Sequence, residues 1–85
     1  MKLLFQNNGS RTTRMAVVVA RGCGGAVRRN REKRITREAY RSVKESVNPG
    51  MDLVILVVRF GARYAERRAA LTQALGRAGL RLQAD

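Results

Sequence analysis

The chain has 85 residues, of which 45% are hydrophobic, so it is long enough for one small domain and too apolar for a disordered basic tail. Its 18 Lys and Arg residues outnumber six Asp and Glu residues, which gives a formal charge of +12. So one-sided a charge repels itself in a compact state, and it predicts a polyanionic partner: nucleic acid, or with less support an anionic membrane surface.

The composition argues against a self-sufficient enzyme. The chain has no His and only one Cys, which can form neither an internal disulfide nor a zinc site. The acidic residues show no spacing typical of metal or acid–base sites. No signal-peptide pattern is visible, and the longest apolar run, 53–58, is far shorter than the roughly 20 residues of a membrane span. We therefore expect a cytoplasmic binding protein with no membrane partner, in which Cys23 is a small, half-buried side chain.

Two strands are predicted at the start of the chain. Residues 2–6 and the β-branched run 15–20 have the length and composition of strands. Asn7-Asn8-Gly9-Ser10 between them is typical of a turn, so we expect a hairpin with a loop of about eight residues. A glycine-rich loop follows at 22–25.

A helix is predicted over residues 29–46. Asn30 is a candidate N-cap, and Glu32 would lie in the first turn, where the helix dipole favours an anion. The apolar positions recur every four residues and predict a buried face: Ile35, Ala39 and Val43, with Tyr40 beside them. Asn48-Pro49-Gly50 ends this element.

The second half of the chain predicts a strand and a helix. Residues 52–58 are apolar without alternation, which indicates a strand buried on both faces. Residues 64–78 repeat apolar side chains with helical spacing, and Gly79 followed by Leu80 fits a glycine C-cap. The order β-β-α-β-α, with one parallel crossover, indicates a small α+β sandwich forming a single domain over 1–85.

Most of the charge lies in one segment. Nine cations and two acids between positions 21 and 44 supply +7 of the +12: Arg21, Arg28, Arg29, Arg31, Lys33, Arg34, Arg37, Arg41 and Lys44 against Glu32 and Glu38. Steps of four and three place five polar side chains on one helix face: Asn30, Arg34, Arg37, Arg41 and Lys44. A helix face that is merely solvated normally carries alternating positive and negative side chains, and this one does not. Arginine also favours bidentate contacts with phosphate. Few side chains here could read base edges, so we expect recognition of an RNA or DNA backbone or shape.

Three other features leave weaker alternatives. Tyr40 is better explained as core than as a stacking residue, whereas Phe5 suits the core or a single-strand stacking surface equally. The glycine loop lacks the third glycine of a dinucleotide fingerprint, since Val27 occupies that position, and it lacks a P-loop lysine.

Segment 26–41 resembles the signature helix of the bacterial ribonuclease P protein component. The resemblance centres on Arg29-Asn30-Arg31, followed by Lys33, Arg34 and Arg37, and it extends to Pro49-Gly50-x-Asp52, Arg59 and Arg77-Ala78-Gly79-Leu80. It implies a subunit that binds a large catalytic RNA, with Mg²⁺ held mainly by the RNA, and assists removal of the 5′ leader from precursor tRNA. The implied fold is of the ribosomal protein S5 domain 2-like class, with a left-handed βαβ crossover.

The resemblance also implies roles for individual residues. The RNA contacts that it implies are on the helix: Arg29, Asn30, Arg31, Lys33, Arg34 and Arg37. The charge pattern adds three further RNA-binding candidates: Arg21, Arg28 and Arg41. Members of the family usually have a further helix and strand segment before the region matching Met1, so leader binding would fall to Phe5 and Val17. The sheet face left uncovered would invite self-association. A small ribosomal or RNA-chaperone protein is the alternative function, and a membrane-active amphipathic peptide is a weaker one.

Overall fold

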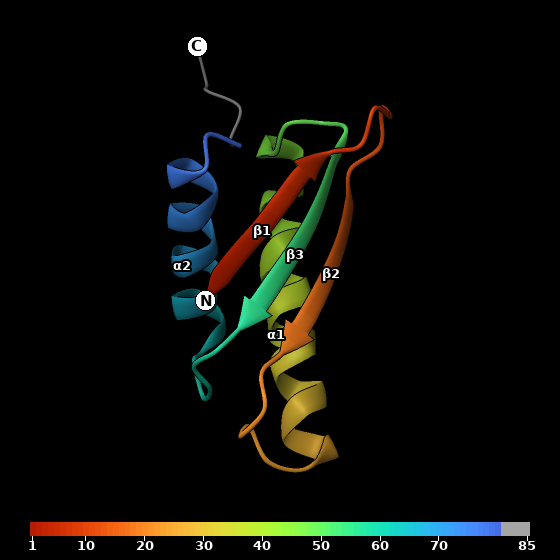
Figure 1. The fold of residues 1–85 in the computed structure, drawn as a ribbon. Coiled ribbons are helices and arrows are strands. Elements are labelled where there is room, and N and C mark those ends of the chain that lie inside the picture. Colours follow the sequence, from red (N-terminus) through yellow and green to blue (C-terminus); the bar gives the residue numbers. More distant parts are fainter. Residues whose placement is uncertain (81–85) are drawn as a thin grey trace.

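The computed structural model describes residues 1–80, which form a three-stranded sheet with two helices on one of its faces (Figure 1). The elements in chain order are β1 (Lys2–Asn7), β2 (Arg14–Val19), α1 (Ala26–Val43), the short 3₁₀ helix η1 (Lys44–Ser46), β3 (Met51–Val57) and α2 (Tyr64–Arg77). The predicted order β-β-α-β-α is confirmed. No helix within residues 1–80 is both long and apolar enough to cross a membrane.

The predicted hairpin is wrong, because β3 lies between the first two strands. β1 pairs with β3 antiparallel and β2 pairs with β3 parallel, which gives the order β1-β3-β2. The connection from β1 to β2 crosses the end of β3 and is tied to the segment before it: Asn8 N–H donates to the Gly50 carbonyl at 2.9 Å, and the Thr13 hydroxyl donates to the Asn48 carbonyl at 2.9 Å. The most apolar strand thereby gains a partner on each edge.

The crossover from β2 through α1 to β3 is left-handed. In Figure 1 both parallel strands run downward, α1 passes behind them, and β3 lies to the left of β2. This hand is rare among parallel crossovers, and it agrees with the fold that the family resemblance implies.

β3 is buried on one face only, which corrects the expectation of burial on both. Leu53, Ile55 and Val57 lie beneath the helices and are at most 2% exposed, whereas Val54 and Leu56 are half-buried on the open face. Both helices pack on the same side, so an apolar run without alternation still has one uncovered side.

α1 begins at Ala26, three residues earlier than predicted, with Gly25 as its N-cap. Asn30 therefore lies inside the helix rather than capping it, and Glu32 is not in the first turn. The helix ends at Val43, where η1 replaces its predicted last turn. The predicted buried face is confirmed, and the fully buried Thr36 also lies on it.

The C-terminal end of α2 is closed as predicted. Gly79 has a φ of 71°, the left-handed conformation that glycine adopts without strain. Leu80 N–H bonds to the Leu75 carbonyl at 3.0 Å and Gly79 N–H to the Gly76 carbonyl at 3.1 Å, which is the Schellman pattern. Leu80 is buried in the main core, so the cap also fixes α2 against the sheet.

Candidate nucleic-acid interface

The side of α1 that faces away from the sheet carries the predicted cationic stripe. Every member is exposed: Asn30, Arg34, Arg37, Arg41 and Lys44, the last in η1. They point outward because the opposite side of the helix, including Ala39 and Val43, packs with Ile55 and Leu71 in the main core. The core therefore sets the orientation of the charged face.

The remaining predicted RNA contacts surround the start of this stripe. Arg21, Arg28 and Arg31 are exposed, and Arg29 and Lys33 are half-buried. Arg29 Nη2 donates to the Val19 carbonyl at 3.0 Å, so this side chain also joins α1 to the end of β2. Because part of its guanidinium is occupied within the protein, Arg29 has fewer donors left for RNA than its neighbours.

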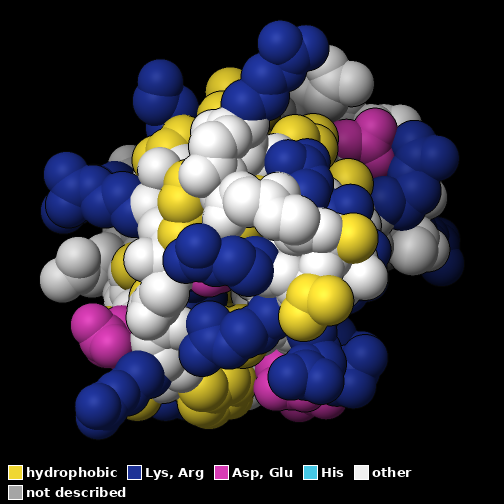
Figure 2. All heavy atoms as spheres, turned by 90° about the horizontal axis from the view of Figure 1, so that it is seen from below, with side chains coloured by type: hydrophobic (Ala, Val, Ile, Leu, Met, Phe, Trp, Pro, Cys, Tyr) yellow, Lys and Arg dark blue, Asp and Glu magenta, His cyan; other side chains and the backbone are white. Residues whose placement is uncertain are grey.

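The end of the molecule where α1 begins is dominated by cations. Figure 2 views this end from below, and Lys and Arg side chains spread across it with few Asp or Glu side chains between them. A polyanion approaching this end meets predominantly positive charge, which favours association electrostatically.

Glu32 does not weaken this surface, because its carboxylate points into the protein. Its side chain is 3% exposed, and Oε2 lies 2.8 Å from Nη2 of Arg67 on α2. Oε1 accepts a hydrogen bond of 2.7 Å from Gly61 N–H in the loop before α2. The negative charge on the N-terminal half of α1 is thus neutralised internally, and its exposed charges there are all positive.

The Glu32–Arg67 pair was missed at the sequence level, although the helical spacing contained a signal. Glu32 precedes Ile35 by three positions, and Arg67 precedes Leu71 by four, so both charges fall on the apolar faces of their helices. Two opposite charges on two buried faces predict an internal ion pair.

The aromatic and leader-binding candidates do not share one free surface. Tyr40 is buried in the main core, as expected, and burial raises the pKa of its hydroxyl. Val17 is only 8% exposed and packs in a small cluster with Val19, Cys23 and Val57, which corrects its assignment as a leader contact. Phe5 is 47% exposed on the edge strand and keeps a surface for stacking. Cys23, expected to be half-buried, is fully buried.

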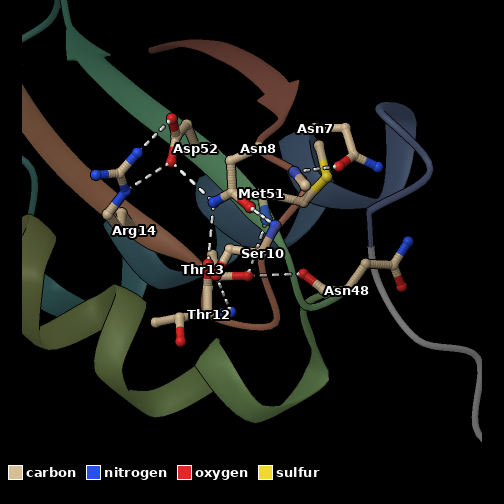
Figure 3. A network of polar contacts seen from close by, with 10 residues as sticks. Asn7, Asn8, Ser10, Thr12, Thr13, Arg14, Asn48, Met51 and Asp52 are labelled. Atoms are coloured by element: carbon tan, nitrogen blue, oxygen red, sulfur yellow. Dashed lines mark hydrogen bonds and ion pairs between the residues drawn. The ribbon is translucent and has the colours of Figure 1, made fainter.

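A second polar network lies at the opposite end of the sheet, where it joins all three strands (Figure 3). Arg14 on β2 makes a bidentate pair with Asp52 on β3, with contacts of 3.0 and 3.1 Å, and Asn8 Nδ2 donates to the same carboxylate at 3.0 Å. The hydrogen bonds from Arg14 and Asn8 lower the pKa of Asp52. With all these groups paired to one another, we interpret the network as structural.

Residues 1–80 contain no group of three His, Cys, Asp or Glu side chains placed to hold a metal ion. What the described surface offers instead is a row of cations on a rigid helix, with a buried counter-charge behind it.

The sequence model of the Ribonuclease P family matches residues 1–79. The chain belongs to the ribonuclease P protein family. A ribonuclease P protein component from Herpetosiphon aurantiacus is 50% identical over 52 residues, which are 61% of this chain and 42% of that protein. One from a Roseiflexus species is 39% identical over 82 residues, covering 92% of this chain and 66% of that protein. The chain therefore spans less than half of the first relative and about two thirds of the second.

Solved ribonuclease P proteins share the fold. The protein from Thermotoga maritima superposes with a TM-score of 0.79 at 32% identity, over 88% of this chain and 74% of that one. The Staphylococcus aureus protein gives the same TM-score of 0.79 at 22% identity, over 92% and 73% of the two chains, and supports the fold alone. The family and the fold that the Arg29-Asn30-Arg31 segment indicated are thus confirmed.

Proposed function

We propose that this chain is the protein subunit of a ribonuclease P ribonucleoprotein and that the exposed face of α1 binds its catalytic RNA. The single observation that carries the proposal is the one-sided charge of that face, with the family's Arg-Asn-Arg segment at its start and Glu32 turned inward. An arginine-led face without alternating acids suits phosphate recognition better than mere solvation.

In this proposal the division of labour leaves the chemistry to the RNA. The RNA subunit holds Mg²⁺ and cleaves precursor tRNA, whereas the protein raises the affinity of the complex for substrate and metal in the cytoplasm. The exposed Phe5 ring on the edge strand is the remaining candidate for stacking on the single-stranded 5′ leader. We also propose that Arg21, before the glycine-rich loop, and the exposed cations of α1 contact the RNA.

The decisive experiment is reconstitution of leader cleavage. The protein is added to a ribonuclease P RNA and a precursor tRNA at a Mg²⁺ concentration too low for the RNA alone, and cleavage is followed on a gel. We expect stimulation by the native chain and a weaker effect from a variant with Arg34→Ala and Arg37→Ala. A folded, RNA-bound protein that gives no stimulation would overturn the proposal.

A competition experiment separates this function from that of a general basic RNA-binding protein. Labelled ribonuclease P RNA is displaced from the protein by ribosomal RNA or by mixed RNA of equal mass. The proposed function requires a clear preference for ribonuclease P RNA, whereas a ribosomal or chaperone protein would show none.

The open face of the sheet supports a secondary proposal, self-association. Leu4 and Val18 are 59% and 47% exposed there, beside the half-buried Val54 and Leu56. Exposed apolar patches of this kind favour association between copies. Sedimentation of the native chain and a Val18→Lys variant tests this: only the native chain should form dimers, and a monomer at all concentrations would refute it.

A further inference from the structure

Val27 is an apolar side chain left exposed within the cationic face of α1. It is 84% exposed, more than Leu4 or Phe5 on the edge strand. Asn30, Arg31 and Arg34 follow it by three, four and seven positions, so they share its side of the helix. An exposed Val27 contributes nothing to the core, and its apolar side chain cannot hydrogen-bond to a phosphate.

These four side chains line one open hollow. Val27, Asn30, Arg31 and Arg34 line an open hollow of about 390 Å³ on the surface of α1. They project from about two helical turns, roughly 10 Å of axis, which is comparable to the width of a nucleobase with its stacking partners. Asn30 and Arg34 are exposed, and within residues 1–80 they make no side-chain hydrogen bond, so their polar groups are available to a ligand. Arg31 Nη1 lies 3.8 Å from Glu32 Oε1, which leaves most of its guanidinium free.

The chemistry of the lining matches an unpaired base. A guanidinium plane stacks on a base, and a carboxamide offers a donor and an acceptor that pair with a base edge. An exposed apolar side chain such as Val27 favours contact with the face of an aromatic ring over contact with a hydrated phosphate. Base-paired RNA does not fit, because its deep, narrow major groove keeps base edges away from a protein helix.

We propose that this hollow holds a single unpaired nucleobase of the RNA bound to α1. Arg37, Arg41 and Lys44 farther along the same stripe then contact phosphates. The inference rests on the proposed function and adds a base-reading position to a face that otherwise reads only backbone. An acidic peptide is a poorer occupant, since it would use the arginines but neither Val27 nor Asn30.

The test uses the salt dependence of RNA affinity, because base and phosphate contacts differ in it. Affinity of the full chain for ribonuclease P RNA is measured over a range of NaCl concentrations for Val27→Ser, Asn30→Ala and Arg37→Ala. Val58→Ser serves as the matched control, since Val58 is an exposed valine outside the hollow. We expect Val27→Ser and Asn30→Ala to weaken binding about tenfold with an unchanged salt slope, as for lost stacking or base-edge bonds. Arg37→Ala should flatten the slope by about one unit.

A second measurement identifies the base. Chemical footprinting should reveal a nucleotide whose base is protected by the native chain and reactive with Asn30→Ala. Replacing that nucleotide by an abasic residue should weaken binding to the native chain and leave Asn30→Ala almost unaffected. Native-like binding by Val27→Ser and Asn30→Ala, or a slope change like that of Arg37→Ala, would overturn the nucleobase site alone. An unchanged salt slope for Arg37→Ala, together with native-like affinity of all three variants, would instead overturn RNA binding by α1.

Discussion

Glu32 and Arg67 depend on each other because both are enclosed by protein. Their side chains are 3% and 4% exposed, and Arg67 Nε has no hydrogen-bond partner within the described residues. Removing one charge leaves the other buried without a counter-ion, which typically costs about 3–5 kcal/mol. We therefore expect Glu32→Gln to lower the free energy of unfolding by about 3 kcal/mol in urea denaturation.

The control for this substitution lies on the same helix. Glu38 is exposed, so Glu38→Gln removes the same charge type with an expected change of less than about 1 kcal/mol. Equal unfolding free energies for the two variants would contradict the proposed contribution of the buried Glu32–Arg67 pair to stability.

Asp52 gives the sheet an acid-sensitive contact. Hydrogen bonds from Arg14 and Asn8 lower its pKa below the ordinary 3.8, so the folded state holds this proton less tightly than the unfolded state. A lowered pKa means that the contribution to stability is present above the ordinary value and is lost as pH falls through the folded pKa. Urea midpoints measured between neutral pH and pH below 4 should show this acid-dependent loss in the native chain and less of it in Asp52→Asn. Parallel curves for the two proteins would count against it.

At the scale of elements, the end of α2 offers a matched pair of glycines. Gly79 has a φ of 71°, whereas Gly76 lies inside the helix, and a Cβ there would meet no atom within 4 Å apart from its chain neighbours and the nearby helix backbone. Gly79→Ala should lower the free energy of unfolding by about 1 kcal/mol because it forces a left-handed conformation on alanine. Gly76→Ala should raise it by about 0.5–1 kcal/mol. Thermal unfolding of the two variants should therefore shift in opposite directions, and a common direction would be inconsistent with the cap.

The cations of the stripe beyond the hollow, Arg37, Arg41 and Lys44, should contribute similarly to RNA affinity. With about six phosphates contacted, log affinity should fall with log salt at a slope of several units. Arg37→Ala and Arg41→Ala should each flatten that slope by about one unit, measured by filter binding. Arg11→Ala is the control, because Arg11 is exposed in the loop between β1 and β2 and lies outside the α1 face. An unchanged slope in both stripe variants would mean that this face does not touch phosphate.

Local patterns predicted the elements well and their spatial order poorly. The apolar spacing of Ala39 and Val43, and of Leu71 and Leu75, was sufficient to identify the buried faces of both helices. The insertion of β3 between the first two strands depends on contacts such as Asn8 with Gly50, which are 42 positions apart and leave no local trace. Neither the left-handed crossover nor the Glu32–Arg67 pair could be derived from one element considered alone.

The candidate site was also predicted where the signal is local and missed where it depends on tertiary packing. The cations were assigned correctly to one helix face because helical spacing is local. Val17 was misassigned because burial of a strand residue depends on which side the helices cover, and Asn30 was misassigned as a cap because Gly25 begins the helix without a side-chain bond. The hollow around Val27 became visible only once the start of α1 was known.

At the scale of the whole molecule, the net charge of +12 acts in opposite directions on folding and on RNA binding. Salt screens the repulsion among the exposed cations of the free protein and should stabilise it. Salt also reduces the free energy gained by releasing counterions from RNA and should weaken the complex. We expect the thermal midpoint of the free protein to rise with NaCl, by roughly 4–8 °C for each kcal/mol of repulsion removed, while RNA affinity falls.

An Arg11→Gln variant separates the two effects, because Arg11 is exposed in the loop between β1 and β2 and outside the α1 face. It should raise the thermal midpoint at low salt with little effect on RNA affinity, whereas Arg37→Gln should raise the midpoint and weaken binding. A thermal midpoint independent of salt would show that self-repulsion of the fold is negligible, and the excess charge would then act on RNA alone.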